Sequence, residues 1–234
     1  MVNPSRMKPV RMVVVEDENM VADMFMAWLR RRPQFQVVGH ATNGLQALDL
    51  CRAEKPDLAM IDVKLPGMDG LSLSAQLLAS LPQLKILIVS SCCDAYCLYR
   101  VNQLGLHGFV DKMSPLAVLG EALEAVATGK SYFSKLFREH MERQLKQPDA
   151  FHKIISQREI EILHLLATGL EDEEIAKKLT ISVVTVEAHR RNIRRKLNLH
   201  SDRALISRAQ QLGLSLDHSA RSPAKLGGLG STSP

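Results

Sequence analysis

Polar residues suited to metal and phosphate chemistry follow short apolar segments in the first half of the chain. Glu16 and Asp17 come directly after the first of these segments. Asp62 and Ser90 close two later ones, and Lys112 lies just past another. In an open parallel sheet the functional crevice lies beyond the carboxyl ends of the strands. If the apolar segments are such strands, the five side chains converge on one edge of the sheet.

This set of residue types predicts a specific kind of site. Three carboxylates in one pocket repel one another and need a cation. Mg²⁺ fits because it prefers oxygen ligands in an octahedral shell and keeps several waters. An aspartate can also attack phosphorus and become an acyl phosphate. Lys112 would then pair with one phosphate oxygen, and the Ser90 hydroxyl would donate to another.

The pattern along residues 10–128 is typical of an α/β fold. Short segments rich in Val and Ile, several of them apolar throughout, alternate with helical patterns. Such repeats predict a doubly wound parallel sheet, here with five strands. The expected strands are 10–15, 35–40, 58–62, 85–90 and 108–110. The expected helices are 19–31, 45–53, 71–80, 94–104 and 115–128.

A second, helical domain follows. Residues 129–150 are expected to form a helical linker that ends at the breakers Pro148 and Asp149. Residues 151–216 predict helices only, and the Gly-, Ser- and Pro-rich stretch 217–234 predicts a disordered tail. The expected helices are Ile155–Ala167, Asp172–Leu179, Val183–Leu197 and Asp202–Gln211.

Charge and apolar content narrow the class of protein. The net charge is +5, yet residues 1–132 balance 13 basic against 13 acidic residues, and five basic residues crowd between Arg190 and Lys196. That concentration is expected of an element that enters a nucleic-acid groove. No segment has the length of a membrane helix or a secretory signal, so we expect a cytoplasmic protein without membrane attachment. The cysteines are interpreted as apolar fillers: Cys51, Cys92, Cys93 and Cys97.

The segment 183–197 is expected to be a two-faced helix. Ser182 is a good N-cap for it. Spacing at 100° per residue places one set of side chains toward the core: Val186, His189, Ile193 and Leu197. The opposite side holds Glu187, Arg191 and Arg194, with Val184, Ala188 and Arg195 beside them. A helix that packs on its own domain and enters a major groove must have this pattern.

Residues 10–128 resemble the flavodoxin-like receiver domains of response regulators. The matching stretches are VVVEDE, IDVKLPGMDG, LIVSS and GFVDKMSP. The resemblance implies that Asp62 is the phosphoacceptor and that Glu16 and Asp17 hold Mg²⁺ together with the backbone carbonyl of Lys64. It further implies the switch pair Ser90 and Phe109 and the phosphate-pairing Lys112. Met113 and the run Ser91-Cys92-Cys93 depart from the usual pattern.

The second domain resembles the LuxR-type helix-turn-helix through ISQREIEILHLLATGL, EEIAKKLTISVVTVEAHRRNIRRKL and RAQQLGL. The resemblance implies that Glu187, Ala188 and Arg191 face bases. Contacts to phosphates are implied for Lys178, Thr185, Arg195 and Lys196, and Arg194 is included among the DNA-binding residues. Residues 171–174, all acidic, depart from the family, and Asp172 and Glu173 would repel DNA.

Together the two resemblances indicate a response regulator of the NarL/FixJ type. Phosphorylation of Asp62 by a partner histidine kinase would release the DNA-binding domain, which the receiver otherwise blocks, and favour a homodimer on double-stranded promoter DNA. An aspartyl-phosphate phosphatase is excluded because Lys64 stands where its second aspartate would be, so we expect no enzyme. A regulator whose receiver acts unphosphorylated, as a dimerisation or docking module, is the alternative.

Overall fold

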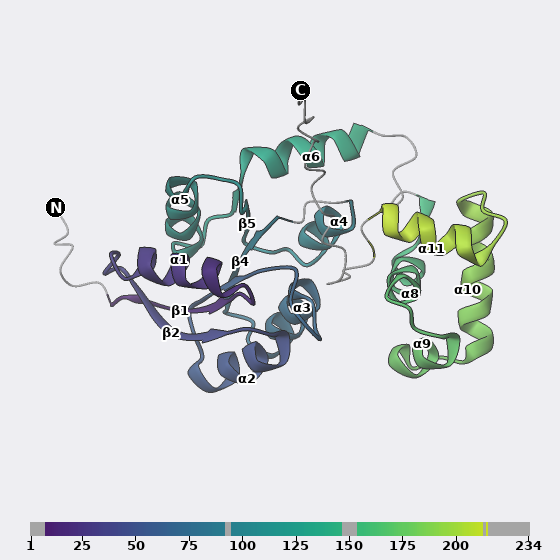
Figure 1. The fold of residues 1–234 in the computed structure, drawn as a ribbon, viewed down its shortest axis with the longest axis horizontal. Coiled ribbons are helices and arrows are strands. Elements are labelled where there is room, and N and C mark those ends of the chain that lie inside the picture. Colours follow the sequence, from purple (N-terminus) through teal and green to yellow (C-terminus); the bar gives the residue numbers. More distant parts are fainter. Residues whose placement is uncertain (1–7, 92–94, 147–153, 213, 215–234) are drawn as a thin grey trace, which may run out of the picture.

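The computed structural model describes residues 8–91, 95–146, 154–212 and 214. These residues form a sheet-based part and a helical part (Figure 1). Within the described residues, no helix is long and apolar enough to cross a membrane. Cys92, Cys93, Pro148, Asp149 and the predicted disordered tail lie outside the described residues.

The first part is a parallel sheet in the order β2-β1-β3-β4-β5-β6. Its strands are β1 (Val10–Val15), β2 (Phe35–Ala41), β3 (Leu58–Ile61), β4 (Lys85–Ser90), β5 (Gly108–Asp111) and β6 (Tyr132–Phe133). The doubly wound parallel sheet expected from the sequence is confirmed. The strand order reverses between β1 and β3, which opens a crevice at the carboxyl edge of the sheet.

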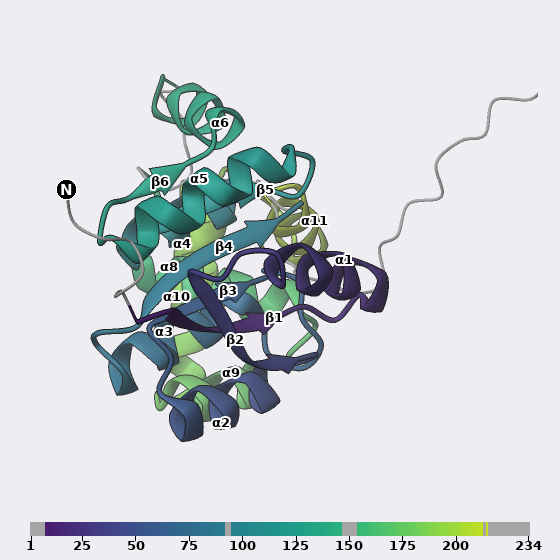
Figure 2. The same ribbon diagram turned by 90° about the vertical axis from the view of Figure 1, so that its left-hand side faces the viewer.

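Helices cover both faces of this sheet (Figure 2). They are α1 (Asn19–Leu29), α2 (Gly44–Glu54), α3 (Gly70–Ser80), α4 (Ala95–Gln103) and α5 (Leu116–Ala127). Successive residues of β1 point to opposite faces, as the pleat requires. Met12 and Val14 belong to a buried cluster with α1 and α5, whereas Val13 and Val15 belong to one with α2 and α3.

The sheet has six strands, where the sequence predicted five. The sixth, β6, falls in the segment expected to be a helical linker, and it pairs with β5 through Gly108 and Phe109. Two residues are too few to produce a periodic pattern, so the prediction missed this strand. The helix expected in the same segment is present as α6 (Lys135–Lys146).

Among the described residues, the second part has the helices α8 (Gln157–Ala167), α9 (Asp172–Leu179), α10 (Val183–Lys196) and α11 (Asp202–Gln211). All four agree with the expected helices within two residues. Ser182 caps α10 as predicted, because its hydroxyl accepts the N–H of Thr185 at 3.1 Å. Val186 and Ile193 of α10 are fully buried, and Leu197 is half-buried against the core. His189 is only half-buried, so the prediction that it is a buried histidine was wrong.

Two cysteines behave as the sequence indicated. Cys51 and Cys97 are buried thiols. Burial raises the pKa of the Cys51 thiol to about 12, so it stays protonated and unreactive. Both residues pack as small apolar groups in the core.

Candidate functional site

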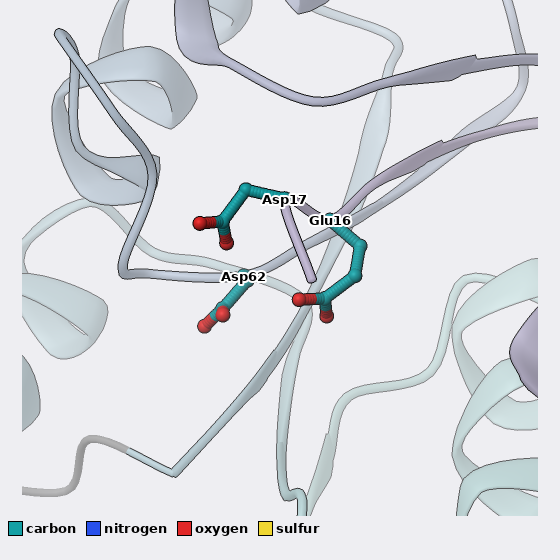
Figure 3. A group of neighbouring side chains, drawn as sticks. All are labelled: Glu16, Asp17 and Asp62. Atoms are coloured by element: carbon teal, nitrogen blue, oxygen red, sulfur yellow. The ribbon is translucent and has the colours of Figure 1, made fainter. Parts of the chain in front are cut away.

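Three acidic side chains meet at the carboxyl edge of the sheet. Glu16 and Asp17 follow β1, and Asp62 follows β3. The N–H of Asp62 donates to the carbonyl of Val15, which fixes the two strand ends side by side. Carboxylate oxygens of the three residues lie within 4.8 Å of one another. Figure 3 shows the three side chains gathered at this place. Such a cluster of oxygen donors could hold a metal ion.

Lys112, which follows β5, enters the same pocket. Its ammonium donates to Oδ2 of Asp62 at 2.6 Å and to Oε1 of Glu16 at 2.9 Å. Glu16 and Asp62 are buried, and the lysine is nearly so. The structure therefore brings together four of the residues that the sequence assigned to one site.

The electrostatics of the pocket leave an excess of negative charge. Burial raises the pKa of Glu16 to about 7, although the Lys112 hydrogen bond acts against it. Burial also lowers the pKa of Lys112, but the neighbouring Asp62 and Glu16 outweigh it, and the net pKa is raised. One ammonium cannot offset three carboxylates. A divalent cation with oxygen preference is the partner that these donors fit.

A glycine-containing loop after β3 shapes the wall beside Asp62. The N–H of Lys64 donates to Oδ1 of Asp62 at 3.3 Å, and the N–H of Gly70 donates to the carbonyl of Val63. A Cβ on Gly70 would stand 1.9 Å from the carbonyl oxygen of Asp62. Only glycine permits this approach. Gly67, at φ +79°, turns the same loop. Neither glycine was predicted to have a role from the sequence.

Ser90 ends β4 beside this pocket, and Phe109 lies in the neighbouring strand β5, two residues before its end. Ser90 is fully buried, and its carbonyl accepts the N–H of Lys112 at 3.2 Å. Phe109 is fully buried too, and its ring lies 4.7 Å from that of Phe137 on α6. Sequence reasoning missed Phe137. It links the strand that ends at the pocket with the helix that leads out of the sheet.

The outer face of α10 is open. Val184, Glu187, Ala188, Arg191 and Arg195 are all exposed. Lys178, at the end of α9, is exposed as well, and Thr185 is half-buried with its hydroxyl 2.7 Å from that of Ser182. This outer face carries the side chains expected to meet bases.

Three other basic residues of α10 are held by ion pairs inside the domain. Arg190 donates two hydrogen bonds to Asp172 and lies 2.9 Å from Asp202. Arg194 lies 2.7 Å from Asp202. These pairs tie α10 to α9 and α11. The expectation that Asp172 repels DNA therefore needs correction, because a guanidinium compensates its charge.

Lys196, expected at a phosphate, is the third of these residues. Its ammonium donates to Oε2 of Glu159 at 2.7 Å. Glu159 also accepts the N–H and the hydroxyl of Ser156, which completes a capping box at the start of α8. Lys196 thus joins the end of α10 to the beginning of α8.

The sheet-based part contacts α8 and the end of α11. The ring of Tyr96 on α4 stacks on His164 of α8, with centroids 5.0 Å apart, and the N–H of Tyr96 donates to the carbonyl of Leu212. Burial lowers the pKa of His164, so the ring is neutral in this contact. In Figure 1, α8 and α11 lie between the sheet and α10. The sequence led us to expect that the first domain blocks the DNA-binding domain. This expectation is not met at the outer face of α10.

Comparisons with known proteins match both parts of the chain. Residues 12–124 match the response regulator receiver domain, and residues 153–209 match the bacterial regulatory proteins of the luxR family. The response regulator protein VraR of Staphylococcus aureus is 28% identical over 190 residues, which cover 81% of this chain and 91% of that protein.

Solved structures share the fold. RcsB of Salmonella enterica serovar Typhimurium, bound to the promoter rprA with the phosphomimetic BeF₃⁻, has a TM-score of 0.67 and 24% identity, covering 86% of this chain and 98% of that one. The response regulator ChrA of a heme-sensing two-component system has a TM-score of 0.52 and 26% identity, covering 89% of this chain and all of that one.

Proposed function

Because the chain belongs to the response regulators that join a receiver domain to a LuxR-type DNA-binding domain, we propose that phosphorylation of Asp62 controls sequence-specific DNA binding by α10. The observation that carries this proposal is the pocket in which Lys112 bridges Asp62 and Glu16 beside Asp17. The same proposal places the protein in the cytoplasm, free of the membrane. We assign residues 10–128 to the receiver and 151–216 to the DNA-binding domain.

The phosphodonor is a partner histidine kinase. A carboxylate oxygen of Asp62 attacks the phosphorus of a phosphohistidine, and the new O–P bond forms as the N–P bond breaks. The imidazole leaves with the electron pair of the broken bond and takes up a proton. Lys112, already 2.6 Å from Asp62, pairs with an oxygen of the transferred group. Buried between carboxylates, it stays protonated for this task.

Mg²⁺ is the cofactor that the acidic cluster fits. Glu16, Asp17 and Asp62 would supply carboxylate oxygens, and the backbone carbonyl of Lys64 would be the fourth protein ligand. When bound, the ion neutralises charge that builds up on the phosphoryl oxygens. The hydrogen bond from the Lys64 N–H to Asp62 supports the placement of the Lys64 backbone beside the site.

The signal leaves the pocket through Ser90 and Phe109. The Ser90 hydroxyl donates to the new phosphoryl group, and Phe109 adjusts behind it. Because Phe109 packs on Phe137, a change of its position acts directly on α6. Phosphorylation shifts the populations of two existing arrangements of the receiver and does not create a new one.

DNA binding is the output. Glu187, Ala188 and Arg191 face bases, while Lys178, Thr185 and Arg195 contact phosphates. Arg194 and Lys196 reach DNA only if they leave their ion pairs with Asp202 and Glu159, so we expect them to contribute less to DNA binding than the other residues. A single helix of this size reads few base pairs. We therefore propose that the phosphorylated protein binds two half-sites as a homodimer.

Mass measurement after incubation with acetyl phosphate and Mg²⁺ tests the acceptor. Wild type and the matched control Asp23→Ala, an exposed aspartate of α1, should gain the mass of one phosphoryl group, and Asp62→Ala should gain none. Sedimentation and DNA binding on the same samples should show dimerisation and tighter binding in the first two alone. An equal mass gain in Asp62→Ala would refute the assignment. Phosphorylation without any change in DNA binding would favour a receiver that acts as a docking module.

A further inference from the structure

The second residue of α10 is an apolar side chain without a role in the core. Val184 is 73% exposed. It stands four residues before Ala188 and seven before Arg191, so the three lie along one stripe of the helix. The neighbouring Val186 and Val183 turn inward, the first fully buried and the second half-buried. Packing therefore accounts for Val186 but not for Val184.

The stripe changes character along the helix. Its first half presents the apolar pair Val184 and Ala188, and its second half presents Arg191 and Arg195. The N-terminal residues of a groove-entering helix are those that contact base edges. Among the groups that bases present in the major groove, the 5-methyl of thymine is the apolar one.

We propose that Val184, together with Ala188, reads the 5-methyl group of one thymine in each half-site. The inference rests on the proposed function and names part of its target. Glu187 stands one turn from Val184, and its carboxylate can accept a hydrogen bond from the amino group of cytosine or adenine. The thymine should therefore lie next to one of these bases. The receiver leaves the stripe free, because its contacts reach α8 and the end of α11.

The test uses the full chain after treatment with acetyl phosphate and Mg²⁺. Duplexes that bind are first selected from a random pool. Each thymine of the selected site is then replaced singly by uracil, which lacks only the methyl group and keeps the hydrogen-bonding edge. Affinities are compared for wild type, Val184→Ala and, as a control, Met113→Ala, whose residue is 85% exposed on the receiver. Alanine is the better helix former, so Val184→Ala keeps α10 intact.

At one thymine of each half-site, uracil should weaken binding by wild type and by Met113→Ala about fourfold, the effect of one buried methyl group. Val184→Ala should bind the thymine and uracil duplexes alike. If a binding site is selected and Val184→Ala still prefers thymine to uracil at every position as wild type does, the inference is wrong and the proposed function stands. So would a wild type that never distinguishes the two bases. Failure to select any preferred sequence would overturn the proposed function itself.

Discussion

Replacing Lys196 by alanine should destabilise the DNA-binding domain. The Lys196 ammonium lies 2.7 Å from Oε2 of Glu159, whose side chain is only 4% exposed. Without Lys196, this carboxylate keeps the N–H and hydroxyl of Ser156 as donors. A nearly buried charge would then lack its counter-charge. The substitution thus acts on the contact between α8 and α10, whatever Lys196 does at DNA.

The size of the effect follows from the exposure of the two partners. A hydrogen bond to a charged group contributes about 1.5–3 kcal/mol, whereas an exposed ion pair contributes about 0–1 kcal/mol. Glu159 is nearly buried, but the Lys196 side chain is 35% exposed and water screens it. The donors of Ser156 also remain. We therefore expect a loss of about 1–2 kcal/mol in the free energy of unfolding of this domain.

The loss should depend on pH in a defined direction. Burial raises the pKa of Glu159, but hydrogen bonds from Lys196 and Ser156 outweigh it, and the net pKa is lowered from 4.5. A carboxyl with a lowered pKa stabilises the fold above its unfolded pKa, and this contribution is lost as the pH falls through the folded value. The difference between wild type and Lys196→Ala should therefore be full at pH 7 and shrink below about pH 4.5.

Amide hydrogen exchange of the full chain, followed by mass spectrometry, resolves the two domains. At pH 7 in moderate urea, peptides from α8 and α10 should exchange roughly 5- to 30-fold faster in Lys196→Ala than in wild type. Lys177→Ala is the control, because Lys177 is exposed on α9 and makes no ion pair with any described residue. Urea midpoints at falling pH check the sign. Exchange in Lys196→Ala equal to that in Lys177→Ala would refute the argument.

Two further predictions concern DNA and the domain contact. Arg191→Ala should lose roughly 1–3 kcal/mol of binding free energy on a cognate duplex and little on a scrambled one. Arg195→Ala should weaken binding to both duplexes alike and reduce the salt dependence of the binding constant by about one unit of slope. Salt-titrated binding tests both, and equal losses on the two duplexes for Arg191→Ala would contradict the assignment of Arg191 to a base. Tyr96→Ala removes the stack on His164, so the two domains of the unphosphorylated chain should move more independently of each other. The radius of gyration in X-ray scattering should rise, and two copies should place their α10 helices on two half-sites more readily and bind DNA more tightly. A variant unchanged in both respects would show that this contact restrains neither.

The receiver site was predictable because its geometry follows from topology. Carboxyl ends of parallel strands meet at one edge, so residues as far apart as Glu16, Asp62 and Lys112 had to approach one another once the strands were recognised. The strands that these residues follow, β1, β3 and β5, are short and mostly apolar, so the sequence shows where each one ends. Distances between the side chains add detail, but the identity of the set does not depend on them.

Features that depend on tertiary contacts escaped the sequence. The two residues of β6 join the sheet only because Gly108 leaves room beside them: a Cβ there would stand 2.5 Å from the carbonyl of Tyr132. Phe137 meets Phe109 through the placement of α6, which no local pattern specifies. His189 lies at the margin of the core-facing arc, and a helical wheel does not show that neighbouring helices leave that margin half-open.

Charge on α10 shows how far composition can mislead about a binding surface. The five basic residues between Arg190 and Lys196 indicated a helix devoted to DNA. Three of them instead hold Asp172, Asp202 and Glu159, and so fix α10 on α8, α9 and α11. The positive charge left on the exposed face of this segment comes from Arg191 and Arg195. Binding that rests on these two arginines and on Lys178 of α9 needs base-edge contacts and a second subunit to reach specific affinity, which is why the apolar start of the helix matters to recognition.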